Sequence, residues 1–238
     1  MRTGPDLAIA GLVQVAGIRS LAEARMVRAC GVDFLGFPLR LSVHDPDTTE
    51  DDARSIMAAV GPQNCVLITY ETDPYSLLAF CRFLGVDIVQ LHADVPPETI
   101  RLIKARAALR IIKSYVVGRD SLSPKDFVRA YAVSCDAFIT DTFDPVSGAS
   151  GATGKTHDWT VSAELVRCST RPVILAGGLD PDNVREAIRI VRPAAVDAHT
   201  GVEAPDGSKD ETLVRSFVQE ARVGFAHVLD HAQWGRPR

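Results

Sequence analysis

Short apolar runs alternate with longer amphipathic segments along the whole chain. The segments between the runs carry apolar residues at helical spacing, and each is long enough for the crossover helix of a parallel β/α unit. Eight such units in 238 residues predict a single (β/α)8 barrel, because doubly wound sheets usually stop at about five or six strands. The runs occupy residues 11–16, 32–37, 65–70, 87–92, 110–117, 135–141, 172–177 and 194–199.

Turn and capping residues mark the ends of several predicted helices. Gly31 supplies a stop for the first helix. In the segment DPDNVREAIRIV, Asp180 is a candidate cap and Pro181 occupies the first helical position. We expect one barrel domain over the whole chain, with residues 224–238 as a tail beyond the last helix and Trp234 packed on the barrel or in an oligomer contact.

Composition and charge narrow the class of partner. The net charge is -4, so the chain lacks the basic excess of a nucleic-acid-binding protein. The N-terminal apolar run is short and interrupted by glycine, which predicts neither a signal peptide nor a membrane span. Five cysteines without a C-x-x-C pair are typical of reduced, buried thiols. We therefore expect a cytoplasmic protein, monomeric or homodimeric, with no nucleic-acid or membrane partner.

The segment SGASGATGKTHDW contains a sequence similar to a nucleotide-binding P-loop. That motif requires a glycine five residues before Gly154, and the residue there is Ala149. The segment also follows the sixth run rather than the first, and Asp158 is the expected cap of the next helix. We therefore expect a lid that closes on a ligand, with Gly154 and Lys155 contacting the substrate.

Glycines after the seventh and eighth runs indicate a phosphate site. Gly177 and Gly178 lie in AGGLDPDN, where backbone N–H groups can approach an anion near a helix start. Thr200 and Gly201 follow the eighth run in HTGVE. In a (β/α)8 barrel the loops after these two strands often bind phosphate. The alternative is that the glycines only form tight turns.

Acidic and basic residues within the runs are candidates for chemistry. Asp141 ends the sixth run, so it is expected at the barrel mouth, although a strand-end aspartate can also cap a turn. Asp33, Asp87 and Asp197 lie earlier in their runs and are interpreted as structural. Lys113 lies within the fifth run and could face Asp141 or the substrate only if it points inward.

Several motifs together resemble the phosphoribosylanthranilate isomerase family of tryptophan biosynthesis. They are GVDFLGF, DIVQLHAD, RIIKS, FITDTFDP, GATGKTHDW, PVILAGGLDPDNVREAI and VDAHTGVE, in family order and spacing. The resemblance implies an Amadori rearrangement of a phosphoribosyl amine without a cofactor. It implies that Asp141 is the general acid and that the backbone around Gly177, Gly178, Thr200 and Gly201 binds phosphate.

Two positions depart from the family pattern. The family's general base is a cysteine in a K-I-C-G motif, and this sequence reads QVAG with Ala16 at that position. A positioned base typically contributes about 10²- to 10⁴-fold to the rate, so the loss is chemically important. The family's carboxylate-binding arginine after the second strand has no clear counterpart, although Arg40 could form a bidentate pair with a carboxylate. The alternative is that Arg40 is a solvated loop residue.

Histidines are the candidate replacements for the missing base. His92 and His199 each end a run and are expected at the mouth, and His44 and His157 lie on loops. Each of them could instead orient a neighbouring group by hydrogen bonding. Their spacing matches no compact metal motif, so we expect no metal.

Three functions remain open from the sequence. The first is an isomerase acting on a phosphoribosyl amine with a substituted base. The second is a barrel without catalytic activity that binds a sugar phosphate, and the third is a lyase or synthase of a specialised pathway that uses the same phosphate site.

Overall fold

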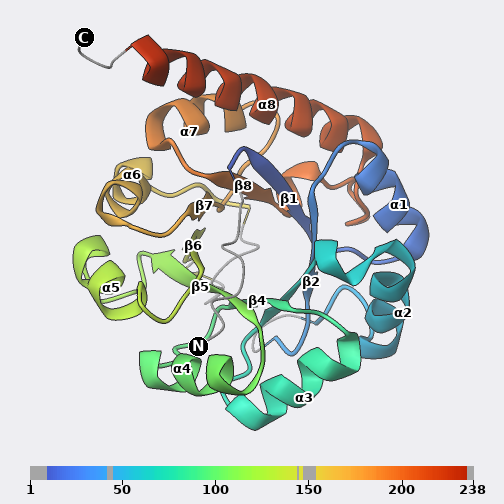
Figure 1. Cartoon of the computed structure of the whole chain (residues 1–238). Helices are drawn as coiled ribbons and strands as arrows, with labels where there is room; N and C mark the ends of the chain where they lie inside the picture. The colour runs from blue at the N-terminus through green and yellow to red at the C-terminus, as the bar shows by residue number, and fades with distance from the viewer. Residues whose placement is uncertain (1–9, 42–44, 144, 147–153, 235–238) are drawn as a thin grey trace.

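Eight parallel strands close into a barrel, and helices surround it (Figure 1). The computed structural model describes residues 10–41, 45–143, 145–146 and 154–234, without the side chains of 229–234. The predicted (β/α)8 fold is confirmed. The strands are β1 (Leu12–Ala16), β2 (Phe34–Pro38), β3 (Cys65–Thr69), β4 (Ile88–Leu91), β5 (Arg110–Val117), β6 (Ala137–Thr142), β7 (Val173–Leu175) and β8 (Ala195–Ala198).

Helices follow the strands around the outside of the barrel. Side chains of Ser20, Thr49, Asp73, Ser123 and Asp158 cap five of them by accepting a backbone N–H of the first turn. The helices are α1 (Leu21–Ala29), α2 (Glu50–Val60), α3 (Pro74–Leu84), α4 (Pro97–Arg106), α5 (Pro124–Tyr131), α6 (Trp159–Cys168), α7 (Val184–Val191) and α8 (Glu211–Trp234), with short 3-10 turns at Pro62–Asn64 and Thr200–Val202 (η2). None of the helices in the described residues is long and apolar enough to cross a membrane.

Two helix boundaries differ from the sequence-based expectation. Helix α7 begins at Val184, because Asp180 accepts the N–H groups of Asp182 and Asn183 and holds these residues in a turn. Helix α8 continues to Trp234, so the backbone of 224–234 is helical rather than a separate tail. The side chain of Trp234 lies outside the described residues.

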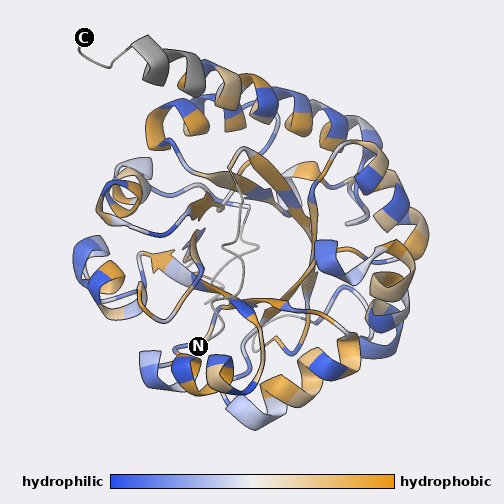
Figure 2. Cartoon of the chain, in the orientation of Figure 1, coloured by the Kyte–Doolittle hydropathy of each residue, from blue (hydrophilic) through white to orange (hydrophobic). Residues whose placement is uncertain are grey.

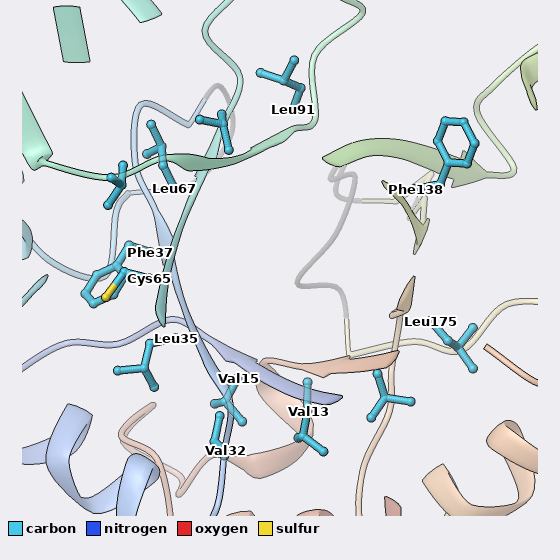
Figure 3. Packing of buried hydrophobic residues seen from close by; sticks show 14 of the residues in the cluster. Val13, Val15, Val32, Leu35, Phe37, Cys65, Leu67, Leu91, Phe138 and Leu175 are labelled. Atoms are coloured by element: carbon cyan, nitrogen blue, oxygen red, sulfur yellow. The ribbon is translucent and has the colours of Figure 1, made fainter. Parts of the chain in front are cut away.

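Alternation along the strands divides the apolar residues between two cores. One set points outward and packs under the helices, as Val13, Val15, Phe138 and Leu175 do in Figure 3. The helices accordingly mix apolar and polar residues (Figure 2). A second set fills the inside of the barrel and includes Ala16, Ile68, Ile88, Ile112, Ile139, Ile174 and Ala195.

The N-terminal ends of the strands are held by carboxylates. Asp33 accepts the N–H of Val13 at 2.8 Å and pairs with Arg222 of α8 at 2.6 Å. Asp136 accepts the N–H of Ile111 at 2.7 Å and pairs with Lys104 at 2.6 Å. These contacts join neighbouring strands and helices at the face of the barrel away from the mouth.

Candidate active site

A cavity of about 280 Å³ opens at the C-terminal ends of the strands. This is the face where barrel enzymes place their chemistry. Strand ends and following loops from most of the barrel contribute to its wall. The residues that line it include Ala16, Arg19, Pro38, Leu41, Asp45, Asp47, Ile68, Tyr70, Gln90, His92, Asp141, Gly154, Gly177, Gly178, Asp197, His199, Thr200, Glu203 and Gly207.

Asp141 lies in β6 near its end, with its side chain in the cavity wall. Its Oδ1 accepts the N–H of Thr142 at 2.8 Å, which fixes the carboxyl in place. Burial raises the pKa of Asp141 to about 7, although the Thr142 N–H and the charge of Arg119 act in the opposite direction. A carboxyl with this pKa carries a proton in a substantial fraction of molecules at neutral pH.

His92 lies beside Asp141 and bonds to a chain of polar side chains. Its Nδ1 lies 3.9 Å from Asp141 Oδ2, and its Nε2 lies 2.6 Å from Gln90 Nε2. The Gln14 amide in turn donates to Gln90 Oε1 at 3.2 Å. Burial, together with the charges of Lys113 and Arg119, lowers the pKa of His92 to about 3, so its ring is neutral. At 3.9 Å, His92 Nδ1 makes no hydrogen bond to Asp141, and it has no other hydrogen-bond partner among the described residues, so His92 lies beside Asp141 as a neutral ring.

Asp197 also lines the cavity, which differs from its interpretation as a structural residue. It pairs in register with Gln14 of β1, and only 8% of its surface is exposed. Its Oδ1 has no hydrogen-bond partner among the described residues. Burial and the nearby carboxyl of Asp141 raise the pKa of Asp197 to about 8. Alternation along β8 could have revealed it, since Asp197 lies two residues before His199 and shares its face.

His199 is held between carboxylates directly after β8. Its Nε2 lies 3.3 Å from Glu203 Oε1 and 3.7 Å from Asp47 Oδ2. The fully buried ammonium of Lys209 binds the same Glu203 oxygen at 2.6 Å and the backbone carbonyl of His199 at 3.2 Å. Glu203, Asp47 and Lys209 were not singled out from the sequence. They fix the position of the imidazole beside the end of β1.

Ala16 lines the cavity at the end of β1, and the next residue, Gly17, faces His199. A Cβ added to Gly17 would overlap His199 Nε2, so glycine makes room for the imidazole. None of the five cysteines lines the cavity, and all five are free thiols. Among the described side chains, the imidazole of His199 therefore lies next to Gly17, beside the position of Ala16, where the family carries its thiol.

Gly177 and Gly178 after β7 and Thr200 after β8 line the cavity, whereas Gly201 does not contribute to its wall. Gly177 and Gly178 both have positive φ, at 97° and 64°, which favours glycine. A Cβ on Gly178 would overlap the backbone of Lys155 and Thr156, and a Cβ on Gly201 would overlap the carbonyl of Leu179. The backbone segments 155–156, 177–179 and 200–201 therefore pack closely around one end of the cavity.

The loop before α6 is described from Gly154 onward. Gly154 lines the cavity, whereas Lys155 is exposed and does not contribute to the wall. His157 also lies outside the wall, because its Nδ1 meets Thr142 Oγ1 at 2.9 Å and its Nε2 meets Ser162 Oγ at 2.6 Å. The glycine-rich part of the expected lid, 147–153, and the candidate base His44 lie outside the described residues.

Arg40 and Lys113 point away from the cavity. The guanidinium of Arg40 lies 2.9 Å from Glu50 and 3.3 Å from Glu71, and it covers the ring of Phe80 at 3.7 Å. This arrangement differs from the expected contact with a substrate carboxylate. Lys113 faces outward, and its Nζ lies 5.6 Å from the centroid of the Tyr131 ring. Because it does not point into the barrel, it does not pair with Asp141.

Comparison with known proteins places this geometry in one family. Residues 13–220 match the family described as N-(5'-phosphoribosyl)anthranilate (PRA) isomerase. The N-(5'-phosphoribosyl)anthranilate isomerase 2 of Methanosarcina mazei is 36% identical over 220 residues, which cover 91% of this chain and 96% of the relative.

Solved structures agree with this result. The N-(5'-phosphoribosyl)anthranilate isomerase from Pyrococcus furiosus has a TM-score of 0.72 and 27% identity, and the match covers 89% of this chain and 98% of that one. A phosphoribosyl anthranilate isomerase in complex with reduced 1-(o-carboxyphenylamino)-1-deoxyribulose 5-phosphate gives a TM-score of 0.71 and 29% identity, with the same coverage. The chain belongs to the PRA isomerase family.

Proposed function

We propose that this aldose–ketose isomerase converts a phosphoribosyl amine to a 1-amino-1-deoxyribulose 5-phosphate with Asp141 as general acid and His199 as general base. The observation that carries the proposal is the position of the Asp141 carboxyl, buried in the cavity that the glycine-lined loops after β7 and β8 border. The family supports the reaction class, and the position of these side chains in the cavity supports the proposed roles.

The phosphate binds at the glycine end of the cavity. Its proposed donors are the backbone N–H groups around Gly177, Gly178 and Gly201 and the hydroxyl of Thr200. Gly154 closes this end, since a Cβ there would lie 3.4 Å from Thr200 Oγ1. Lys155 is a further proposed substrate contact, because its backbone packs against Gly178. The sugar then extends from the phosphate toward Asp141 and His199.

Asp141 performs the ring-opening step. Its protonated carboxyl donates a proton to the furanose ring oxygen, the C1'–O4' bond breaks, and the nitrogen lone pair forms the C1'=N bond. The ring oxygen becomes the C4' hydroxyl. A pKa of about 7 suits a group that must be protonated before this step and ionised after it.

His199 removes the C2' proton in the next step. The C–H electron pair forms the C1'=C2' bond of an enolamine, and the iminium nitrogen takes back its lone pair. The imidazolium returns a proton to C1' while the Asp141 carboxylate takes the proton of the C2' hydroxyl, which becomes the ketone, so both residues regain their starting protonation states. Histidine suits this role near neutral pH, and the Glu203 carboxylate 3.3 Å away stabilises the imidazolium. His92 is a proposed positioning residue, because its Nδ1 lies 3.9 Å from Asp141 Oδ2.

The decisive experiment follows the loss of fluorescence when purified protein meets freshly generated phosphoribosylanthranilate. We expect Asp141→Asn and His199→Gln each to lower kcat/KM by about 10²- to 10⁴-fold, with His227→Gln on α8 as the matched control at the wild-type rate. Full activity of Asp141→Asn would contradict the proposal. Full activity of His199→Gln would assign the base to another group.

Ala16 favours a second candidate function, a barrel that binds a sugar phosphate without turnover. It predicts that the wild-type protein binds a ribulose phosphate analogue but does not accelerate the rearrangement of any phosphoribosyl amine.

We propose a monomer or homodimer in the cytoplasm, and the free thiols are in keeping with a reducing compartment.

A further inference from the structure

We propose that the protein has a second ligand site, between β5 and α5, which binds a free α-amino acid with an apolar side chain. The site is a cavity of about 270 Å³ on the outer side of the barrel wall. None of the described residues that line it also lines the cavity at the mouth. The proposal therefore does not depend on the isomerase roles of Asp141 and His199.

The floor of this second cavity holds a buried cation. Lys113 lines it from the outward face of β5, and only 3% of the residue is exposed. Its Nζ lies 5.9 Å and 5.6 Å from the centroids of the Phe127 and Tyr131 rings of α5, which cover it on one side. Burial lowers the pKa of Lys113 to about 8, so the ammonium is still charged in most molecules at neutral pH.

This ammonium has donors left for a ligand. Among the described residues, the Nζ of Lys113 donates a hydrogen bond to the carbonyl of Ser114 at 2.9 Å and forms no ion pair. An ammonium carries three N–H donors, so two remain. A buried charge without an ionic partner is costly, and an anionic group in the cavity would relieve that cost. We therefore assign the carboxylate of the ligand to Lys113.

Both signs of charge line the loops around the opening. Asp94 follows β4, and Arg119 and Asp120 follow β5. The guanidinium of Arg119 lies 3.6 Å from Asp120 and donates to the carbonyl of His92 at 3.5 Å. With Lys113 the wall carries two basic and two acidic side chains. A ligand with several negative charges would be repelled by Asp94 and Asp120, whereas a ligand with one carboxylate and one ammonium matches both signs.

Apolar surface in the same wall favours an apolar side chain on the ligand. Leu122 lines the cavity and is 42% exposed, and the rings of Phe127 and Tyr131 lie deeper. A ligand side chain over Leu122 would remove this surface from water. Small-molecule sites usually measure roughly 300–1,000 Å³, and a cavity at the lower end of this range fits one amino acid better than a nucleotide.

Calorimetric titration with matched compounds tests the class of ligand. The probes are L-valine, L-leucine and L-phenylalanine, and the controls are 4-methylpentanoate and 3-methylbutylamine, which are leucine without its ammonium and without its carboxylate. We expect at least one amino acid to bind, and L-leucine to bind at least about tenfold more tightly than either control, because each control loses one charge-assisted contact. Failure of all three amino acids to bind at about 10 mM would overturn the proposal. Equal binding of 4-methylpentanoate would show a site for any carboxylate and would also overturn it.

Substitutions locate the binding site. Lys113→Met keeps the length of the side chain, and it should weaken the bound amino acid by about tenfold or more. Lys125→Met, at an exposed lysine of α5, is the matched control and should leave the affinity unchanged. Asp94→Asn at the exposed rim should also weaken binding, and it carries the test if Lys113→Met does not fold. Wild-type affinity in a folded Lys113→Met protein would contradict the proposal.

Thermal unfolding separates a ligand site from a structural role of Lys113. The amino acid should raise the Tm of the wild-type protein, because a ligand that binds only the folded chain stabilises it, and should not raise the Tm of Lys113→Met. Without ligand, Lys113→Met should unfold at the same or a higher temperature, since a buried unpaired ammonium is removed. An equal ligand-induced shift in both proteins would overturn the proposal.

A competition experiment keeps the two cavities apart. The amino acid should bind with the same affinity in the presence and absence of reduced 1-(o-carboxyphenylamino)-1-deoxyribulose 5-phosphate. Competition between the two would place the amino acid in the cavity at the mouth and overturn the second site. Loss of isomerase activity in Asp141→Asn, or its absence from the wild-type protein, bears on the proposed function alone.

Discussion

Asp141 and Asp197 place two buried carboxyls in one cavity, and burial raises the pKa of each. Their ordinary value of 3.8 is the appropriate one for the unfolded chain. The folded chain retains the two protons up to about pH 7 and about pH 8, so it binds more protons than the unfolded chain above about pH 4. The contribution of these two carboxyls to the free energy of unfolding therefore falls as pH rises from about 4 to about 8. Ionisation of these two buried carboxyls, which serve the chemistry, therefore lowers the stability of the folded chain.

This linkage predicts that Asp197→Asn stabilises the protein in a pH-dependent way. The amide cannot ionise, so we expect the free energy of unfolding to rise by on the order of 1–3 kcal/mol at pH 8 and by much less at pH 4. Thermal unfolding at the two pH values measures the difference, with Asp51→Asn as the exposed control. A stabilisation of equal size at both pH values would show that ionisation of Asp197 is not its cause.

The imidazole of His157 links strand β6 to helix α6 by hydrogen bonds. His157 bonds Thr142 at the end of β6 and Ser162 inside α6, and a Cβ on Gly177 would come within 3.0 Å of its Nδ1. Burial lowers the pKa of His157 to about 4, so the neutral ring donates with one nitrogen and accepts with the other. The same residue thus supports the strand that carries Asp141 and the loop proposed to bind phosphate.

Replacing His157 by Phe keeps an aromatic ring but leaves both hydroxyls without their partner. We expect a loss of about 1–3 kcal/mol in the free energy of unfolding, measured by urea denaturation. Ser162→Ala should reduce this loss when the two changes are combined, because the Ser162 hydroxyl is then absent. Strict additivity of the two changes would indicate that the His157–Ser162 bond contributes nothing.

The sequence predicted the elements better than the directions of their side chains. All eight strands overlap the apolar runs, because short β-rich runs and helical periodicity are local signals. The outward direction of Lys113 and the inward direction of Asp197 depend on the phase of each strand in the closed sheet, which pairings such as Gln14 with Asp197 establish. The placement of Arg40 depends on Glu71 and Phe80, which lie far along the chain.

The two ends of the barrel have separate roles. Asp141, Asp197 and His199 gather at the C-terminal ends of the strands, where burial and close charges are unfavourable for stability. At the opposite end, Asp33 and Asp136 pair with backbone N–H groups and basic side chains. Stability and chemistry can therefore be altered independently.

Asp33→Ala tests this separation. The change removes the acceptor of the Val13 N–H and the partner of Arg222, so we expect a loss of about 1–3 kcal/mol and a Tm lower by several degrees. Because Asp33 lies away from the cavity, kcat/KM measured well below the Tm should stay at the wild-type value. A large fall in kcat/KM at that temperature would show that the two ends are coupled.

Strand β8 closes the barrel by pairing with β1, the strand nearest the other end of the chain. The backbone N–H of Lys209 likewise binds Glu23 across 186 positions. Contacts between such distant segments form only after the intervening chain has been made. A nascent chain on the ribosome therefore has no closed cavity until translation passes β8. Any product of premature termination before that point lacks His199 and the proposed phosphate loop after β8, so its substrate site is incomplete and it does not compete with the intact enzyme.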